Sequence, residues 1–293
     1  MLTLQVIASG ILLGGFYACM AIGFSVIWGV CGLINLAHGA LMLIGAYISW
    51  WLYNRTGIDP FLTLPISAAA LFVFGAALQR WLLERVLRVS LFMTLVFTFG
   101  LNMLLVNILL EMFSADVRAI TMPYASEALE IGGLRLPWTR IAVCVTSLAL
   151  ALLLHLFMNH TRTGNAIRAS AQNPRAAATM GIDARDMRVM AFALSAGLAG
   201  AAGSLMAILY AFSPISGDSL TLKSFVIVLL GGLGSMGGVI AAAMVLAVTE
   251  NLVAGLGAPG LRDAVSFVML LAILLVSPRG LFGARYQTDA RAR

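Results

Sequence analysis

Residues 1–54 read MLTLQVIASGILLGGFYACMAIGFSVIWGVCGLINLAHGALMLIGAYISWWLYN and contain no Asp, Glu, Lys or Arg. The first charged side chain is Arg55. A helix of about 20 apolar residues crosses the hydrocarbon core of a bilayer, which is about 30 Å thick. This stretch therefore has room for two crossings and is typical of a membrane protein.

The rest of the chain continues this composition. Of its 293 residues, 61% are hydrophobic and 10% are charged, against about 45–50% and about 25% in soluble domains. Continuous apolar runs that do not alternate exclude an outer-membrane barrel. We therefore expect an all-α polytopic membrane protein that forms one transmembrane domain over residues 1–293. The predicted spans are 5–30, 36–53, 61–80, 90–112, 139–158, 188–211, a glycine-broken region at 223–255, and 262–277.

The charges predict the orientation of the spans. The net charge is +6, and arginines gather in 80–88, in 160–188 and in the tail after Pro278, whereas acidic residues dominate the loop 113–138. The positive-inside rule places the basic connections and the C-terminus in the cytoplasm and the loop 113–138 outside. Nucleic-acid binding is not favoured, because no basic stripe with interleaved aromatics is present.

The region 223–277 must then cross the membrane an odd number of times, although its hydropathy suggests two crossings. Either three short spans fit, or one stretch enters and leaves by the same face, for a total of eight or nine helices. Glycines interrupt this region between Gly231 and Gly238. Broken helices at membrane depth are tolerated where they line a cavity or are buried in protein, and they point to transport sites.

Two glycine-broken stretches resemble each other: FSVIWGVCGLINLAHG at 24–39 and FVIVLLGGLGSMGGV at 225–239. They predict an internal repeat with a site at its interface, although any two glycine-rich apolar stretches look alike. Asn35 suits the N-cap of the following helix. Substrate contact at this polar cluster is compatible with that role, since a half-helix N-terminus also offers N–H groups to an anion. The candidate pathway residues are Asn35, His38, Gly39, Gly232, Gly234 and Ser235.

The cytoplasmic stretch at about 160–187 contains TRTGNAIRASAQNPRAAATMGIDARD from Thr161. Asn173 suits an N-cap and Pro174 the first helical turn. The alanine-rich residues 175–180 favour a helix, and Gly181 suits the residue just beyond its end. A short preformed helix is suited to a groove on a partner protein. The alternative is a helix that lies on the lipid surface.

Enzyme chemistry finds little support. A P-loop lysine follows a glycine, whereas the only lysine, Lys223, follows Leu222. The GxGxxG pattern at 232–237 lies in a membrane run, which disfavours a dinucleotide site. Glu111 and Glu250 end apolar runs and are expected at the membrane interface. No metal site, cofactor or catalytic set is predicted for this chain.

The chain resembles the inner-membrane permease subunits of bacterial ABC importers for branched-chain amino acids, and it is most similar to the smaller of the two paired permeases. Five segments in family order carry the resemblance. They are GLINLAHGALMLIGAY at 32–47, TRTGNAIRASAQNPRAAATMGID at 161–183, FALSAGLAGAAGSL at 192–205, LLGGLGSMGG at 229–238 and SPRGLFG at 277–283.

The resemblance implies a bacterial inner-membrane importer. Two permeases would form the pathway, two cytoplasmic subunits would bind ATP and Mg²⁺, and a periplasmic protein would deliver substrate. The family's ATPase-docking loop corresponds here to Gly164, Arg168, Asn173, Pro174, Arg175, Ala177 and Gly181.

Two departures from the family leave the solute open. Ala40 stands where many members have an acid, and Met236-Gly237 stands where many have a proline. Urea and short amides are therefore alternatives to branched-chain amino acids. An ion-coupled secondary transporter is a further alternative, and it requires acidic residues within the spans.

Overall fold

The computed structural model describes residues 2–87, 89–125, 127–131, 133–232, 234–276 and 280. Apart from residue 280, the predicted cytoplasmic tail lies outside the described residues. The long helices are α1 (Leu2–Cys31), α2 (His38–Thr56), α3 (Pro60–Leu78), α5 (Leu91–Phe113), α6 (Trp138–His160), α9 (Ala184–Leu209), α10 (Gly217–Gly231), α11 (Met236–Gly255) and α12 (Arg262–Val276). The shorter elements are η1 (Gln79–Leu83), α4 (Glu84–Leu87), α7 (Arg162–Gln172), α8 (Pro174–Thr179), η2 (Pro214–Ser216) and η3 (Pro259–Leu261).

Seven helical segments among the described residues are long and apolar enough to cross a membrane. A mostly helical, multi-pass membrane protein is thereby confirmed. Helices α2 and α12 match the predicted spans 36–53 and 262–277 but are not among the seven, and α12 has 15 residues. The total of eight or nine crossings stays a prediction.

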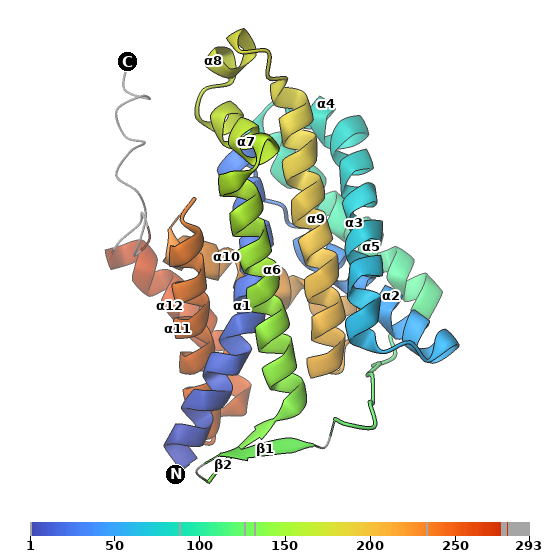
Figure 1. The fold of residues 1–293 in the computed structure, drawn as a ribbon, viewed down its shortest axis with the longest axis vertical. Coiled ribbons are helices and arrows are strands. Elements are labelled where there is room, and N and C mark those ends of the chain that lie inside the picture. The colour runs from blue at the N-terminus through green and yellow to red at the C-terminus, as the bar shows by residue number, and fades with distance from the viewer. Residues whose placement is uncertain are drawn as a thin grey trace.

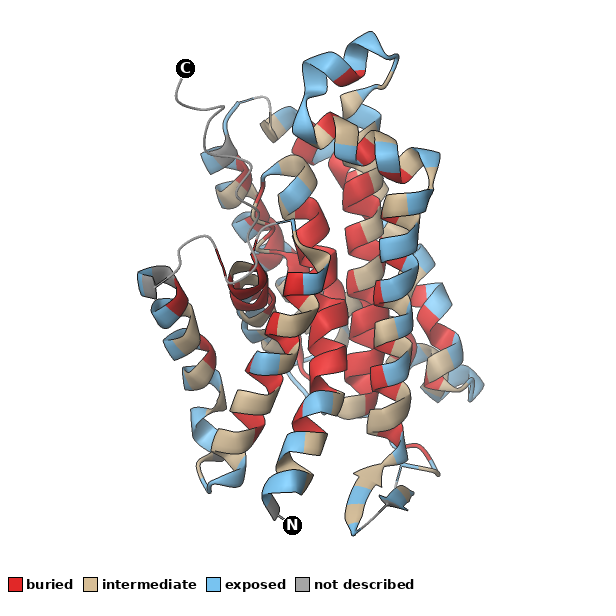
Figure 2. Cartoon of the chain, turned by 60° about the vertical axis from the view of Figure 1, so that its left-hand side comes forward, coloured by how far each residue is buried: buried red, intermediate tan, exposed pale blue. Residues whose placement is uncertain are grey.

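Helices α1 and α9 form the centre of the bundle. The apolar segment of α1 is 89% buried and that of α9 is 78% buried, against 33% for α3, α5 and α6. Figure 2 shows this as a buried interior with exposed outer helix faces. Small residues allow close packing: a Cβ on Gly10 or Gly14 of α1 would lie within 3 Å of the α11 backbone. The two glycines form a GxxxG pair, which lets the backbones of α1 and α11 approach closely.

The two ends of the bundle differ in structure. Helices α4, α7 and α8 lie at one end, and the N-terminus lies at the other (Figure 1). That second end also holds an antiparallel hairpin of β1 (Ala128–Ile131) and β2 (Leu134–Pro137), in register Ala128↔Pro137. The hairpin was not predicted, because its strands have only four residues each within a polar loop.

The loop before the hairpin is fastened to α3. The side chain of Asp59 caps the first turn of α3, and the hydroxyl of Tyr124 donates to the same carboxylate. Burial, together with this hydrogen bond, raises the pKa of Tyr124 well above its usual range. Tyr124 therefore ties this loop to the start of α3.

Candidate functional site

Helix α2 begins inside the molecule. The chain leaves α1 at Cys31, turns at Gly32 with φ +66°, and runs without helix until His38. The Nε2 atom of His38 lies 3.1 Å from the carbonyl oxygen of Met20. Met20 is eleven residues before the end of α1 at Cys31, a distance of about 17 Å at 1.5 Å per residue. Non-helical backbone therefore lies at membrane depth, where it must be enclosed by protein or line a cavity.

Helix α10 also begins at membrane depth. The Nδ2 atom of Asn102 donates to Asp218 in the first turn of α10 at 2.9 Å, and Asn102 is the central residue of α5. A Cβ on Gly39 would lie 1.9 Å from the carbonyl oxygen of Gly217. The N-terminal ends of two half-helices therefore meet, and we call residues 35–39 with 217–221 the half-helix junction.

Four backbone N–H groups at the start of α2, those of residues 36–39, are bonded to acceptors within the protein and are not free for an anion. Ala37 rather than Asn35 is the N-cap of α2, and no side chain caps it. Asn35 instead forms a local turn of the Asx type. The bonds are Leu36 N–H to Thr98 Oγ1 at 3.3 Å, Ala37 N–H to Asn35 Oδ1 at 3.1 Å, His38 N–H to the Asn35 carbonyl at 3.2 Å, and Gly39 N–H to Thr221 Oγ1 at 2.8 Å.

Among the residues that the structure describes, three buried polar atoms around the junction have no hydrogen-bond partner: Asn35 Nδ2, His38 Nδ1 and Asn102 Oδ1. An unpaired buried polar atom costs about 1–3 kcal/mol, so these positions hold unused hydrogen-bonding capacity. Asn35, His38 and Gly39 were predicted from the sequence, whereas Thr98, Asn102 and Asp218 were not. Thr98 and Asn102 are four residues apart and therefore lie on one face of a helix. This spacing of two polar residues within an apolar span could have indicated a polar site.

The other predicted pathway residues lie elsewhere. Gly232 and Gly234 have φ values of +84° and +81° and form the turn after α10. Ser235 caps α11 by accepting the Gly238 N–H at 3.1 Å. Because α10 has 15 residues, it separates this turn from the junction by about 21 Å. The two groups of predicted residues are therefore not brought together within this chain.

A cluster of charged side chains lies between α1, α10, α11 and α12. Glu250 is 1% exposed, and its carboxylate accepts a hydrogen bond from the Tyr17 hydroxyl at 2.6 Å. The same carboxylate lies 3.2 Å from Lys223 Nζ. Lys223 also lies 3.1 Å from Asp263. The Glu250 carboxylate is buried between helices, where its partners compensate its charge. Its position at the membrane interface stays a prediction.

The predicted short helix is confirmed as α8. The Asn173 side chain accepts the Ala176 N–H at 3.0 Å, and Pro174 occupies the first turn. At the other end, the Ile182 N–H donates to the Ala177 carbonyl and the Gly181 N–H to the Ala178 carbonyl. These two bonds form a Schellman motif, so a helix of six residues is closed at both ends.

The predicted docking residues divide by exposure. Gly164 and Ala177 are buried, and the other five are exposed. A Cβ on Gly164 would lie 2.3 Å from the Phe157 carbonyl oxygen, so Gly164 lets α7 fold closely over the end of α6. Arg168 is held by Asn159 and Asn165 at 2.7 and 2.6 Å. Met180, which is not among the predicted docking residues, is 80% exposed.

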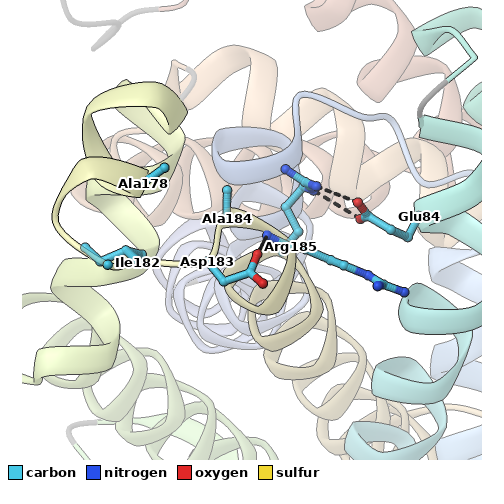
Figure 3. Close-up of a pocket in the computed structure, with 8 residues that line it drawn as sticks. Glu84, Ala178, Ile182, Asp183, Ala184 and Arg185 are labelled. Atoms are coloured by element: carbon cyan, nitrogen blue, oxygen red, sulfur yellow. Dashed lines mark hydrogen bonds and ion pairs between the residues drawn. The ribbon is translucent and has the colours of Figure 1, made fainter.

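An open hollow of about 660 Å³ lies between α8 and the start of α9 (Figure 3). Arg188 and Glu84 form an ion pair that lines it, with Nη2 to Oε1 at 2.5 Å and Nε to Oε2 at 3.2 Å. Glu84 is 3% exposed. This pair joins α4 to α9 beside α8, and the 104-residue separation hid it from sequence reasoning.

These features define a class of protein: a multi-pass membrane protein with half-helices that meet at membrane depth, an arrangement typical of transporters. The family model for the branched-chain amino acid transport system permease component matches residues 6–274, and the chain belongs to this family.

Individual relatives cover nearly the whole chain. The chain is 28% identical to the high-affinity branched-chain amino acid transport system permease protein BraD of Pseudomonas aeruginosa, over 96% of this chain and 95% of that protein. It is 27% identical to LivH of Escherichia coli, with the same coverage. It is 29% identical to LivM of Escherichia coli, over 90% of this chain and 67% of that protein. No solved structure matches the chain at a significant level.

Proposed function

We propose that this chain is a transmembrane subunit of an ATP-driven (ABC) importer that moves branched-chain or related amino acids across the bacterial inner membrane. The observation that carries the proposal is the half-helix junction at membrane depth in a chain whose relatives are named as branched-chain amino acid permeases. The polar junction supports a route for solute through the membrane, and the names of the relatives support amino acids as the solute.

The proposal includes four kinds of partner. A second, homologous permease completes the pathway, and similarity to both LivH and LivM supports such a pair. Two cytoplasmic subunits bind ATP and Mg²⁺, and a periplasmic protein delivers substrate. Helix α8 supports the docking of an ATPase, because it is exposed, capped at both ends and beside a hollow. The exposed docking residues are Arg168, Asn173, Pro174, Arg175 and Gly181.

We place the α8 end in the cytoplasm, with nine crossings and a cytoplasmic C-terminus. The arginines of α7, α8 and the start of α9 support this orientation. The packing pattern supports an inverted repeat of α1–α2–α3 and α9–α10–α11, because α9 packs closely on α3 as α1 does on α11. This repeat pairs the start of α2 with the start of α10, not 24–39 with 225–239.

The mechanism follows from these connections. Closure of the ATPases pushes α8, and the Arg188–Glu84 ion pair passes the motion from α9 to α4 and α3. The movement of α9 shifts α2, against which it packs, and opens or closes the junction at Asn35, His38 and Gly39. The turn at Gly232, Gly234 and Ser235 lets α10 move relative to α11.

One alternative gains support from the fold. An ion-coupled secondary transporter requires acids within the membrane, and Asp218 lies at membrane depth beside Asn102. Such a transporter works without an ATPase, so composition of the purified complex separates the two candidates. Urea or short amides remain alternative solutes for the ATP-driven candidate, and uptake assays with each solute separate them.

The test is a gentle-detergent purification of the tagged chain from its native membrane. We expect a co-purifying ATPase that carries a P-loop. The double variant Arg175→Glu and Met180→Glu changes the exposed face of α8 and should release the ATPase. Glu130→Arg, on the exposed hairpin at the opposite end, is the matched control and should retain it. A chain that purifies alone while its membranes still take up leucine supports the secondary transporter instead.

A further inference from the structure

Asp218 is an exposed carboxylate at the depth of the membrane centre. It lies in the first turn of α10, and its hydrogen-bond partner Asn102 is the midpoint of α5. An ionised side chain facing lipid at this depth is costly, and such residues face bundle interiors or water-filled cavities. The exposed side of Asp218 therefore borders a polar space that this chain alone does not enclose.

The neighbouring amide defines the kind of ligand. Asn102 is 7% exposed, and because its Nδ2 donates to the Asp218 carboxylate at 2.9 Å, its carbonyl oxygen is the free end of the side chain. That Oδ1 atom is buried and has no partner within the described part of the chain. A carboxylate and an unpaired carbonyl oxygen are both acceptors, so the missing partner is a donor, and the negative charge of Asp218 selects a cationic one.

Two exposed apolar side chains lie close to Asn102 along α5. Phe99 is 49% exposed and Met103 is 53% exposed, and both lie within one turn of Asn102 on α5. A ligand that fits carries a cationic donor next to an aliphatic group. The α-ammonium of an amino acid with an aliphatic side chain has both features, whereas urea and short amides carry no charge.

We propose that Asp218 and Asn102 bind the α-ammonium group of the transported amino acid as it passes the half-helix junction. The proposal rests on the proposed function, because it takes the amino acid as the solute. Asp218 supplies the charge, Asn102 Oδ1 accepts a second ammonium N–H, and the faces of Phe99 and Met103 contact the side chain. No covalent step is involved.

The test uses vesicles that contain the complete transporter, ATP inside, and binding protein pre-loaded with radiolabelled leucine. Asp218→Asn removes the charge but keeps the shape and should lower leucine uptake about tenfold, the effect of one charge-assisted hydrogen bond. Asp218→Glu keeps the charge and should recover part of the rate. Asp116→Asn removes an acid that is 74% exposed in the loop after α5 and should match the wild type.

Competition tests the chemistry without a variant. We expect 3-methylbutylamine, which has the ammonium but no carboxylate, to inhibit wild-type leucine uptake, and 4-methylpentanoate, which has only the carboxylate, to have no effect. Inhibition by the carboxylate alone overturns the proposal, even if Asp218→Asn fails to assemble. A requirement for a sodium or proton gradient that Asp218→Asn abolishes overturns it too, by assigning the site to a coupling ion.

The outcomes separate the two proposals. Wild-type uptake of leucine with ATP, together with an Asp218→Asn rate equal to that of the wild type, overturns the ammonium site and leaves the proposed function standing. Absence of ATP-driven leucine uptake by the wild-type vesicles overturns both.

Discussion

At the scale of single residues, ion pairs on the α8 end illustrate how burial decides what a charge contributes. Glu84 is 3% exposed and holds Arg188 through two contacts. Arg80 of η1 and Asp186 of α9 lie 3.7 Å apart with more than half of each side chain exposed. Removing one partner of a buried pair leaves an uncompensated charge, whereas an exposed pair contributes about 0–1 kcal/mol.

We therefore expect Arg188→Met to destabilise the protein by about 3–5 kcal/mol. The matched change Arg80→Met should alter the stability by less than about 1 kcal/mol. Thermal unfolding of the purified complex in detergent measures both. The double variant Arg188→Met with Glu84→Gln should recover much of the loss, since no unpaired charge remains. Equal effects of Arg188→Met and Arg80→Met would show that the Glu84 pair is not buried.

The half-helix junction gives a second prediction at this scale. A Cβ on Gly39 would lie 1.9 Å from the Gly217 carbonyl oxygen and 2.6 Å from Thr221 Oγ1. Gly39→Ala must therefore separate α2 from α10, and we expect loss of solute uptake with most of the protein still in the membrane. Gly29→Ala is the control, because nothing lies within 4 Å of its added Cβ. Normal uptake by Gly39→Ala would rule out close contact of the two half-helices.

At the scale of elements, the sequence predicted the long helices well and the broken ones poorly. The predicted span 90–112 became Leu91–Phe113, and 139–158 became Trp138–His160, because an apolar run of about 20 residues specifies a membrane helix. Helix α10 was predicted to begin near Lys223 but begins at Gly217. The charges of Asp218 and Lys223 made residues 217–223 look too polar for a membrane helix. Their partners Asn102 and Glu250 lie on other helices, and the local sequence pattern does not show them.

The same contrast holds for the site. Asn173, Pro174 and Gly181 were assigned correct places in α8, because capping is a local property that the residue types specify. Asn102 and Asp218 were missed, although they lie together in the fold, because 116 residues separate them. Local chemistry was predictable from this sequence, and contacts between distant half-helices were not.

Helix α8 carries a prediction of its own. Asn173→Ala removes the bond to the Ala176 N–H and should destabilise α8 by about 1 kcal/mol. Hydrogen exchange of the amides in residues 176–179 should then be about fivefold faster, with no change in the amides of α9. Asn173→Ser keeps a capping oxygen and should behave like the wild type. Unchanged exchange in Asn173→Ala would mean that a partner, and not the cap, holds the helix.

At the scale of the whole molecule, the path of the chain after α9 determines the number of crossings. Helix α11 runs antiparallel to α1, because Gly14 meets Met244 near the centre of the bundle and Gly255 meets Val6 near its end. The end of α11 therefore lies beside the start of α1, at the end that holds the hairpin. Three helices, α10, α11 and α12, occupy the region where an odd number of crossings is required.

Single cysteines, placed in a variant without Cys19, Cys31 and Cys144, test this topology. With nine crossings, a membrane-impermeant maleimide should label Glu130→Cys in the hairpin and Leu256→Cys after α11 in intact spheroplasts. It should label Ala176→Cys in α8 only after permeabilisation. Leu256 is 84% exposed, so access does not limit its reaction. If Leu256→Cys, like Ala176→Cys, were labelled only after permeabilisation, the end of α11 would lie on the cytoplasmic side and α11 would not cross the membrane. The inverted repeat would then be wrong, because α11, as the counterpart of α3, must cross.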